Sequence, residues 1–447
     1  RPASRAKQEE GDVLMELTVR GVSRMEGEIG VPGDKSITHR ALLLSSLAEG
    51  DSRVMGYLDG ADCRATMDCL RQLGIPIVKE GEGALVVHGK GLHGWQEPET
   101  VLNCVRSGTT MRLMAGLLAG QDFYSVLSGE SQLRRRPMDR VTRPLRKMEA
   151  RIWGRKSGSL PPLSILGAPL QGVEYAPPMA SAQVKSCVLL AGLYAEGATV
   201  VLEPGPSRDH TERMLRGRGV ELTSEGLRHE LPQAPSRIEP LDVLVPGDFS
   251  SAAYFLVAAL LVSEGEVVIR GVGTNPTRTG LLDALQDMGA EIEILNPRTE
   301  GGEPVEDILV RPQELAAVEV GGAMVPRMID EFPLLALAAS QARGITRVRE
   351  AEELRVKETD RIASIVEALR AMGAHIEEHP DGFDVEGPTP LRSATVDSHG
   401  DHRLAMTLAV AGLLGPGETH VKGAESIADS FPGFVEKLDA LTGGALS

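Results

Sequence analysis

The chain has 447 residues, of which 42% are hydrophobic, 25% charged and only 3% aromatic, as in a globular protein with an aliphatic core. The formal net charge of −16 disfavours nucleic acid as a partner, because nucleic-acid binding needs a positively charged surface. No apolar run approaches the roughly 18 residues that a membrane-spanning helix requires, and the length indicates about two to four domains.

The chain shows neither a disulfide framework nor a targeting segment. Its four cysteines are Cys63, Cys69, Cys104 and Cys187, with no CxxC pair and no histidine at zinc-ligand spacing. We expect four reduced, mostly buried thiols, as in a cytoplasmic protein. Residues 1–11 are polar and charged, so we expect a frayed tail and not a secretory signal.

One pattern recurs along the whole chain: a helical stretch ends in Leu-x-x-(Leu/Met)-Gly or a close variant, and a short β-rich run follows. It occurs at 70–74, 145–150, 215–219, 285–289, 369–373 and 438–443. Leucine and methionine three residues apart share one helix face, and glycine can take the left-handed conformation that ends a helix. The spacing of about 70 to 84 residues exceeds that of common solenoids, so six larger units predict an α/β fold.

A second repeat divides the six units into two halves. The sequence VPGD at 31–34 recurs at 245–248, each time before an apolar helical run. We interpret the two Pro-Gly turns as crossings between two similar domains. Residues 34–245 would form one domain and residues 1–33 with 246–447 the other, with a ligand site in the cleft between them.

Residues 33–40 carry Lys35 and Arg40 at the predicted start of a helix. A helix N-terminus attracts anions, and Ser36 or Thr38 could cap this one. A nucleotide-binding P-loop is disfavoured, because its upstream glycine is missing. The alternative interpretation of this segment is a solvated capping turn.

Further polar segments follow in the same half of the chain, at 106–112, 132–138, 181–186 and 207–212. A small, glycine-containing stretch such as the one around Gly108 lets a ligand approach the backbone closely. In the basic run at 132–138, Pro137 should hold Arg136 in an extended backbone. Each segment alone is also compatible with a turn, a helix cap or a solvated face.

The C-terminal half holds the densest group of charged residues. Asp330 precedes an apolar helix start, residues 355–361 contain five ionisable side chains, and residues 401–403 add a histidine and another cation. On a helix, Glu358 would share a surface with Arg361. An exposed salt-bridged helix would explain 355–361 alone. Two anionic ligands in a cleft would need this convergence of cations, and the extra acids would then handle protons.

Together these motifs resemble the 5-enolpyruvylshikimate-3-phosphate synthase family of enolpyruvyl transferases, from about residue 13 to the last repeat. The similar segments are 33–36, 181–185, 208–212 and 275–278 for class II members, and 354–361 and 401–403 for both classes. The resemblance implies a two-domain inside-out α/β barrel, each domain built from three βαβαββ units, and a monomer without metal or organic cofactor. It implies transfer of the enolpyruvyl group of phosphoenolpyruvate to the 5-hydroxyl of shikimate 3-phosphate by addition and elimination, on the route to chorismate and aromatic amino acids.

The resemblance also implies the site residues. The catalytic residues would be Lys35, Asp330, Glu358 and His402. Glu358 would deliver and recover the C3 proton, and Asp330 would accept the hydroxyl proton. The phosphoenolpyruvate-binding residues would be Lys35, Gly108, Thr109, Arg136, Gln183, Arg361 and Arg403. The shikimate 3-phosphate-binding residues would be Lys35, Ser36, Arg40, Ser181, Ala182, Gln183, Arg208, Asp330 and Lys357.

Two positions depart from the family pattern. Many class I members have a lysine where this chain has Asp429, so one cation is missing or replaced. Glyphosate-tolerant class II members can have alanine where this chain has Gly108. Since glycine leaves room for the inhibitor, we expect glyphosate to inhibit competitively with phosphoenolpyruvate.

Three other functions compete with this interpretation. The related UDP-N-acetylglucosamine enolpyruvyl transferase typically has a cysteine in a mobile loop, whereas residues 132–137 hold arginines and no cysteine. A non-catalytic anion-binding relative is disfavoured by the joint presence of Lys35, Asp330, Glu358 and Arg403. An RNA-processing enzyme of similar topology is disfavoured by the acidic charge and the few aromatic residues.

Overall fold

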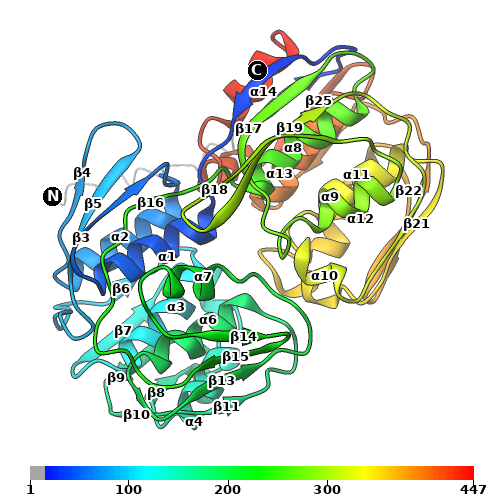
Figure 1. Cartoon of the computed structure of the whole chain (residues 1–447). Helices are drawn as coiled ribbons and strands as arrows, with labels where there is room; N and C mark the ends of the chain where they lie inside the picture. Colours follow the sequence, from blue (N-terminus) through cyan, green and yellow to red (C-terminus); the bar gives the residue numbers. More distant parts are fainter. Residues whose placement is uncertain (1–15) are drawn as a thin grey trace, which may run out of the picture.

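The computed structural model describes residues 16–447, so the tail expected at 1–11 lies outside the described residues. Their buried apolar side chains form two separate clusters, one from residues 37–245 and the other from residues 17–29 together with 249–445. Figure 1 shows the two bodies built around these clusters, which we call the first lobe and the second lobe.

Short helices and strands alternate along the first lobe. Its helices are α1 (Lys35–Ser46), α2 (Ala61–Gln72), α3 (Gly108–Ala119), η1 (Leu133–Arg135), α4 (Asp139–Lys147), α5 (Arg155–Gly158), α6 (Ala182–Gly192) and α7 (His210–Arg216). Its strands are β3 (Glu49–Met55), β4 (Ile77–Lys79), β5 (Ala84–Lys90), β6 (Leu102–Asn103), β7 (Tyr124–Ser128), β8 (Arg151–Gly154), β9 (Leu160–Leu166), β10 (Leu170–Gln171), β11 (Glu174–Tyr175), β12 (Ala195–Glu196), β13 (Thr199–Leu202), β14 (Thr223–Glu225), β15 (Arg228–Leu231) and β16 (Val243–Leu244).

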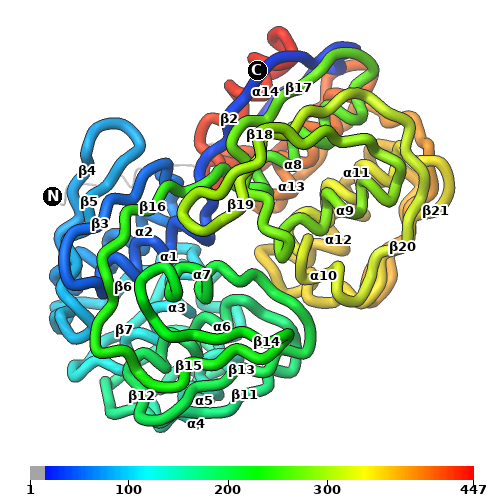
Figure 2. The backbone as a smooth tube through the Cα atoms, viewed as in Figure 1, coloured from blue at the N-terminus to red at the C-terminus, as the bar shows by residue number. Residues whose placement is uncertain are grey.

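The second lobe takes both ends of the described chain. Its helices are α8 (Phe249–Leu261), α9 (Gly280–Asp287), α10 (Met324–Arg327), α11 (Phe332–Gln341), η2 (Glu352–Val356), α12 (Arg361–Ala371), α13 (His402–Gly412), η3 (Ala424–Asp429) and α14 (Phe434–Thr442). Its strands are β1 (Leu17–Arg20), β2 (Gly27–Gly30), β17 (Val267–Gly273), β18 (Glu293–Glu300), β19 (Glu303–Val310), β20 (Glu319–Val320), β21 (Gly344–Val348), β22 (His375–His379), β23 (Gly382–Gly387), β24 (Thr395–Asp397) and β25 (Glu418–Lys422). Figure 2 shows the N-terminal strand β2 running through this lobe before the chain enters the first.

The sheets of both lobes repeat one arrangement, in which a parallel pair of strands is extended by antiparallel strands. In the first lobe the strand orders are β16-β3-β5-β4, β6-β7-β9-β8 and β11-β13-β15-β14, beside the parallel pair β10-β12. In the second they are β2-β17-β19-β18, β20-β21-β23-β22 and the shorter β24-β25-β1. The register of β7 and β9, for example, pairs Tyr124 with Leu166.

The recurring sequence pattern marks the end of a helix and, in each of the five four-stranded sheets, the edge strand that follows: β4, β8, β14, β18 and β22. The closing glycine takes the predicted left-handed conformation, with φ of 94° at Gly289 and 95° at Gly373. In the second unit Glu149 occupies this position at φ 67°. The α/β fold expected from the pattern is confirmed.

Each lobe has helices that are buried along most of their length. In the first lobe these are α1, α3 and α6, and in the second α8, α11 and α13. Figure 1 shows them inside their lobes, with the sheets toward the outside. The first backbone N–H groups of such a helix have no partner within the helix, so its N-terminus is where it can meet a ligand.

The two Pro-Gly crossings lie side by side. The backbone N–H of Asp34 donates to the carbonyl of Pro246, and that of Asp248 donates to the carbonyl of Pro32, both at 2.8 Å. Asp34 caps α1 by accepting from the N–H of Ile37 at 2.8 Å. The expectation that Ser36 or Thr38 caps this helix was wrong, because the helix begins one residue before Ser36.

Residues 355–361 do not form one helix, so the alternative interpretation of this run as an exposed salt-bridged helix was wrong. The 3-10 helix η2 ends at Val356, and α12 begins at Arg361 after its cap Asp360, whose side chain accepts from the N–H of Ala363. Residues 357–360 therefore form a connection, in which side chains are not held to one helical face. Glu358 and Arg361 nevertheless meet, at 2.7 Å.

Two simpler expectations can be compared with the structure. All four cysteines are free and buried, so the prediction of reduced, buried thiols is confirmed. Within residues 16–447, no helix is long and apolar enough to cross a membrane, and α8, the longest, has 13 residues.

Candidate active site

A cavity of about 510 Å³ lies between the lobes, within the range usual for small-molecule sites. The residues selected from the sequence that line it are Lys35, Ser36, Arg40, Gly108, Thr109, Arg136, Ser181, Ala182, Gln183, Arg208, Asp330, Lys357, Glu358, His402 and Arg403. Arg361, the remaining selected residue, is 2% exposed and touches Glu358 and Asp330. The cations from distant parts of the chain thus share one hollow.

The N-termini of four buried helices converge on this cavity. Their first residues include Lys35 of α1, Gly108 of α3, Ala182 of α6 and His402 of α13, all of which line it. A helix N-terminus presents free N–H groups and the positive end of the helix dipole. The cavity is therefore suited to anions before any side-chain charge is considered.

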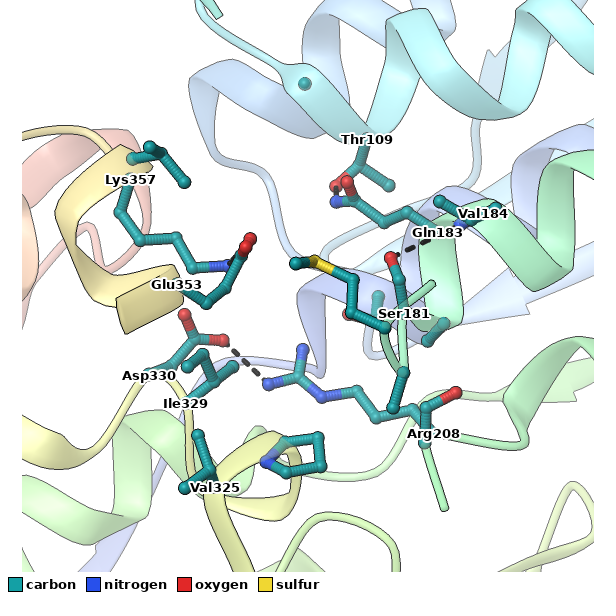
Figure 3. A pocket seen from close by; sticks show the side chains of 18 of the residues that line it. Thr109, Ser181, Gln183, Val184, Arg208, Val325, Ile329, Asp330, Glu353 and Lys357 are labelled. Carbon is teal, nitrogen blue, oxygen red and sulfur yellow. Dashed lines mark hydrogen bonds and ion pairs between the residues drawn. The ribbon is translucent and has the colours of Figure 1, made fainter. Parts of the chain in front are cut away.

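Two acids of the second lobe form ion pairs with arginines of the first. Arg208 Nη2 lies 2.7 Å from Asp330 Oδ2, as Figure 3 shows, and Arg136 Nη1 lies 3.2 Å from Glu358 Oε1. Arg361 adds contacts to the same two carboxylates from within the second lobe. The cations and acids of the site therefore neutralise one another when no anionic ligand is present.

These cations keep both acids ionised. Burial alone would raise the pKa of Glu358, but Arg136 and Arg361 hold it well below its usual range. Burial likewise opposes ionisation of Asp330, yet Arg403 and Arg208 hold its pKa well below the ordinary value. Each carboxylate can accept a proton only after its neighbouring cations have been engaged elsewhere.

Lys35 remains charged at the centre of the cavity. Burial lowers its pKa, but Asp62, whose Oδ2 lies 3.1 Å from Nζ, raises it, and the net shift is upward. His402 behaves in the opposite way, since burial and the nearby charge of Lys35 lower its pKa to about 4. At neutral pH, Lys35 thus offers a positive charge and His402 a neutral ring.

Polar side chains of the first lobe are held by a hydrogen-bond network. Gln183 donates to the Thr109 hydroxyl at 2.9 Å and accepts from Arg112. Arg40 donates to Thr211 at 2.6 Å and to Ser186 at 2.7 Å, and burial lowers its pKa to about 10. These hydrogen bonds fix the orientation of Gln183 and Arg40, two of the residues that line the cavity.

The sequence reasoning missed several charged residues of the site: Asp62, Arg112, Arg140, Asp248, Arg278 and Glu353. Arg278 belongs to the 275–278 motif that supported the resemblance, so a signal for it existed. Asp62 and Arg140 lie outside every segment selected from the sequence. Their importance follows only from the partners that the fold brings to them.

The position that departs from class I members has an ion-pair partner in the other lobe. Asp429 Oδ2 lies 3.1 Å from Arg106 Nη1, and Arg106 also contacts Glu130 at 2.7 Å. Asp429 therefore joins the two lobes through an ion pair, and neither it nor Arg106 lines the cavity.

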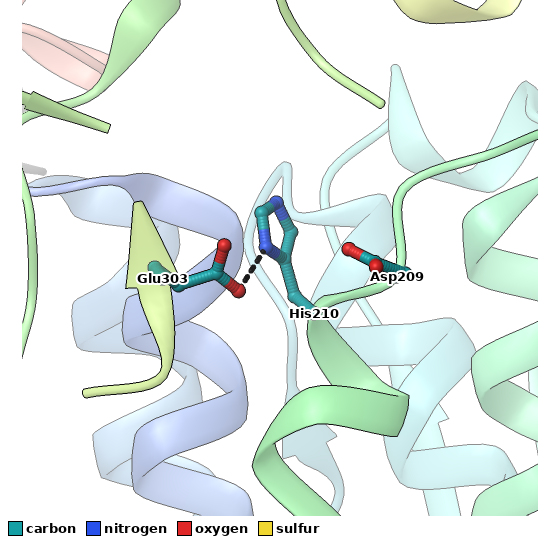
Figure 4. A group of neighbouring side chains, drawn as sticks. All are labelled: Asp209, His210 and Glu303. Atoms are coloured by element: carbon teal, nitrogen blue, oxygen red, sulfur yellow. Dashed lines mark hydrogen bonds and ion pairs between the residues drawn. The ribbon is translucent and has the colours of Figure 1, made fainter. Parts of the chain in front are cut away.

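Asp209, His210 and Glu303 form the cluster closest to a metal site (Figure 4). The Asn275 amide donates to Asp209 at 2.7 Å and to Glu303 at 2.8 Å. The orientation of that amide is set by Thr277, whose N–H and hydroxyl donate to its oxygen. Because N–H groups occupy the carboxylates, we interpret the cluster as a hydrogen-bonded contact between the lobes.

Comparison with known proteins identifies close relatives. The model of the EPSP synthase (3-phosphoshikimate 1-carboxyvinyltransferase) family matches residues 19–438. A 3-phosphoshikimate 1-carboxyvinyltransferase of Citrifermentans bemidjiense is 51% identical over 430 residues, covering 96% of this chain and 99% of its own. One of Desulfitobacterium hafniense is 50% identical over 422 residues, covering 94% and 97%.

Two solved structures with a similar fold are, by name, an EPSP synthase and an enolpyruvyl transferase. EPSP synthase from Acinetobacter baumannii superposes with a TM-score of 0.86 at 41% identity, over 97% of this chain and 99% of that one. The enolpyruvyl transferase NikO from Streptomyces tendae has a TM-score of 0.80 at 19% identity, over 97% and 98% of the two chains. The second likeness concerns the fold alone.

Proposed function

The chain belongs to the EPSP synthase family, and we propose that the cavity between its lobes is the site at which it joins its two substrates. The enzyme is a 3-phosphoshikimate 1-carboxyvinyltransferase, which transfers the enolpyruvyl group of phosphoenolpyruvate to the 5-hydroxyl of shikimate 3-phosphate and releases phosphate. The observation that supports this site most strongly is the convergence of four helix N-termini and many cations on one hollow.

We propose that the two lobes are domains of an inside-out α/β barrel. Residues 34–245 would form one domain, and residues 1–33 with 246–447 the other, each with three βαβαββ units. The two separate apolar clusters, the three repeated sheets in each lobe and the paired crossings support this division. Closure of the domains would bring the cations of both lobes around the substrates and exclude water.

The proposed binding roles follow the chemistry of the lining. Phosphoenolpyruvate would occupy the side formed by Arg136, Arg361 and Arg403, because guanidinium groups bind carboxylate and phosphate with paired hydrogen bonds. Residues Lys35, Gly108, Thr109 and Gln183 would complete that side. Shikimate 3-phosphate would contact Lys35, Ser36, Arg40, Ser181, Ala182, Gln183, Arg208, Asp330 and Lys357.

The proposed proton transfers depend on the exchange of ion pairs. When phosphoenolpyruvate takes the charges of Arg136 and Arg361, Glu358 loses the cations that lower its pKa, and it becomes a better proton carrier. Glu358, having taken up a proton from solvent, would then protonate C3 as the 5-hydroxyl attacks C2, and would recover that proton when phosphate leaves the tetrahedral intermediate. Asp330, released from Arg208 and Arg403, would accept the hydroxyl proton and pass it to the departing phosphate. His402 would lie neutral beside the departing phosphate.

The decisive experiment is a substrate assay. The purified protein is incubated with phosphoenolpyruvate and either shikimate 3-phosphate or UDP-N-acetylglucosamine, and the phosphate released is measured. We expect release only with shikimate 3-phosphate. Release with the nucleotide sugar alone would assign the chain to the related transferase, and release with neither would indicate a non-catalytic anion-binding relative.

We further propose that glyphosate inhibits this enzyme competitively with phosphoenolpyruvate, since Gly108 leaves space beside Arg136 and Arg112. An inhibition constant far above the KM for phosphoenolpyruvate would contradict this. We also propose a cytoplasmic monomer that needs neither metal nor organic cofactor and binds no nucleic acid. The free buried thiols and the net charge of −16 support the reducing compartment and the lack of affinity for nucleic acid.

A further inference from the structure

Glu353, which lines the cavity, contacts two cations from opposite lobes. Arg140 in the first turn of α4 donates two hydrogen bonds to Glu353 of η2, from Nη1 to Oε1 at 2.7 Å and from Nη2 to Oε2 at 2.9 Å. Lys357 Nζ lies 3.2 Å from the same Oε1. Figure 3 shows Glu353 and Lys357 side by side on the second lobe.

The Arg140–Glu353 contact differs from the two ion pairs between the lobes that were described above for the cavity. The pairs of Arg136 with Glu358 and of Arg208 with Asp330 involve residues proposed to touch substrate, so they must separate when substrate binds. Arg140 and Glu353 are not in that set, and their contact can persist with substrate bound. Arg140 and Glu353 also form two parallel hydrogen bonds, a bidentate fork, and each side chain is only 24% exposed. Such an ion pair is stronger than an ordinary pair at the surface.

Glu353 also affects the charge of Lys357. Burial lowers the pKa of Lys357, and Glu353 is the strongest of the groups that oppose this shift. The carboxylate that contacts both lobes therefore also favours the charged form of Lys357 and fixes its position. Lys357 is one of the residues proposed to bind shikimate 3-phosphate.

We propose that Glu353 is a positioning residue: its fork with Arg140 latches the two lobes in the closed arrangement, and its second contact fixes Lys357 for shikimate 3-phosphate. The latch does not depend on the identity of the ligand, whereas the role of Lys357 rests on the proposed function. Closure of the lobes and the positioning of Lys357 thus depend on the same carboxylate.

The first test measures the latch without substrate. Arg140→Met and Glu353→Gln should each increase the radius of gyration measured by small-angle scattering, whereas the charge-retaining Arg140→Lys should increase it less. The control is Arg53→Met, which breaks an ion pair with Glu80 lying wholly in the first lobe, at 53% and 45% exposure. A radius unchanged in both Arg140→Met and Glu353→Gln would overturn the latch.

The second test measures steady-state kinetics. Arg140→Met should raise the KM for shikimate 3-phosphate about tenfold, the size expected for loss of a close charged pair. Glu353→Gln should raise it further, since Lys357 also loses its partner. The double variant should resemble Glu353→Gln, because both changes break the same fork. Additive effects, or equal effects of the two single changes, would overturn the positioning role.

The two tests separate this inference from the proposed function. If the unaltered protein releases no phosphate from shikimate 3-phosphate and phosphoenolpyruvate, the proposed function fails, yet the scattering comparison still decides the latch. Circular dichroism and thermal unfolding of each variant identify any that do not fold. In that case Arg140→Lys, which keeps the charge and loses the fork, replaces Arg140→Met in both tests.

Discussion

At the residue scale, the acids of the cavity pair with the guanidinium groups that we propose as the binding sites of the anionic substrates. Arg361 contacts Glu358 at 2.7 Å and Asp330 at 3.3 Å, and is itself buried. Its third partner, Asp401 at 2.8 Å, also caps α13. A buried guanidinium with three acidic neighbours keeps its charge and its orientation, so it is ready for a planar anion when the other lobe approaches.

Glu358→Gln should lower kcat by about 10²- to 10⁴-fold, the usual contribution of a general acid–base group. The affinity for shikimate 3-phosphate, measured by calorimetry, should stay nearly unchanged, because Gln183, Arg208 and other groups hold that substrate. The control is Glu367→Gln on the exposed side of α12. Turnover equal to that of the unaltered protein would remove Glu358 from the mechanism.

Gly108→Ala should raise the KM for phosphoenolpyruvate and raise the inhibition constant of glyphosate by a larger factor. A Cβ at this position would lie 3.0 Å from Nη1 of Arg112 and 3.3 Å from Nη1 of Arg136, so both guanidinium groups would have to shift. The control is Gly30→Ala, where an added Cβ meets nothing within 4 Å. Unchanged inhibition would show that this space is not used by the inhibitor.

His39 should make the protein less stable in mild acid. Burial lowers its pKa from 6.5 to about 3, so between these values the unfolded chain binds a proton that the folded chain does not. The free energy of unfolding should therefore fall as pH drops below 6.5, by up to about 1.4 kcal/mol per pH unit from this group.

Urea unfolding at pH 7, 6 and 5 measures this dependence. His39→Gln should have a flatter profile than the unaltered protein, and His375→Gln, which removes an exposed histidine, should not. A His39→Gln profile parallel to that of the unaltered protein would show that this histidine does not titrate as its burial demands.

At the scale of elements, one arginine joins the caps of two corresponding helices. Asp34 caps α1 and Asp248 caps α8, the helices that follow the two crossings. Arg278 lies 3.0 Å from Asp34 through Nε and also pairs with Asp248. The 275–278 motif is therefore explained by the crossings: its arginine neutralises two buried aspartates that both lobes need.

Arg278→Met should lower the free energy of unfolding by about 3–5 kcal/mol, because it leaves two buried carboxylates without their cation. Chemical denaturation measures the change. The control is Arg343→Met, which breaks an ion pair with Glu314 at the surface and should cost less than about 1 kcal/mol. Similar losses in the two variants would contradict the structural role of Arg278.

At the scale of the whole molecule, the lobes have separate apolar cores and are joined by two crossings and a few ion pairs. Such an arrangement permits each lobe to lose its structure separately. Substrates that contact both lobes stabilise the joined state over either lobe alone, because a ligand that binds only the folded state adds to its stability.

Unfolding in urea should therefore show two overlapping transitions. Both tryptophans, Trp95 and Trp153, lie in the first lobe, so their fluorescence reports that lobe while circular dichroism reports the whole chain. The two midpoints should differ without ligand and converge with saturating shikimate 3-phosphate and glyphosate. Coincident midpoints without ligand would contradict separate unfolding of the lobes.

Local patterns predicted the fold class and marked the polar segments, and the family resemblance then assigned the site residues within them. The glycine after Leu-x-x-Met, as at 285–289 and 369–373, ends a helix wherever it occurs, and six such marks were enough to predict an α/β protein. The polar residues that open apolar helices, such as Ser181 and Asp401, were visible for the same reason: a cap and its helix are neighbours in sequence.

Only the tertiary structure decided which charges meet. The partners Arg106 and Asp429, which join the two lobes, could not be read from spacing. Arg140 and Glu353 are 213 positions apart, and neither lies in a repeating pattern. Local structure depends on interactions within a few residues, whereas an ion pair between lobes depends on how two separately packed cores are placed, which no local pattern records.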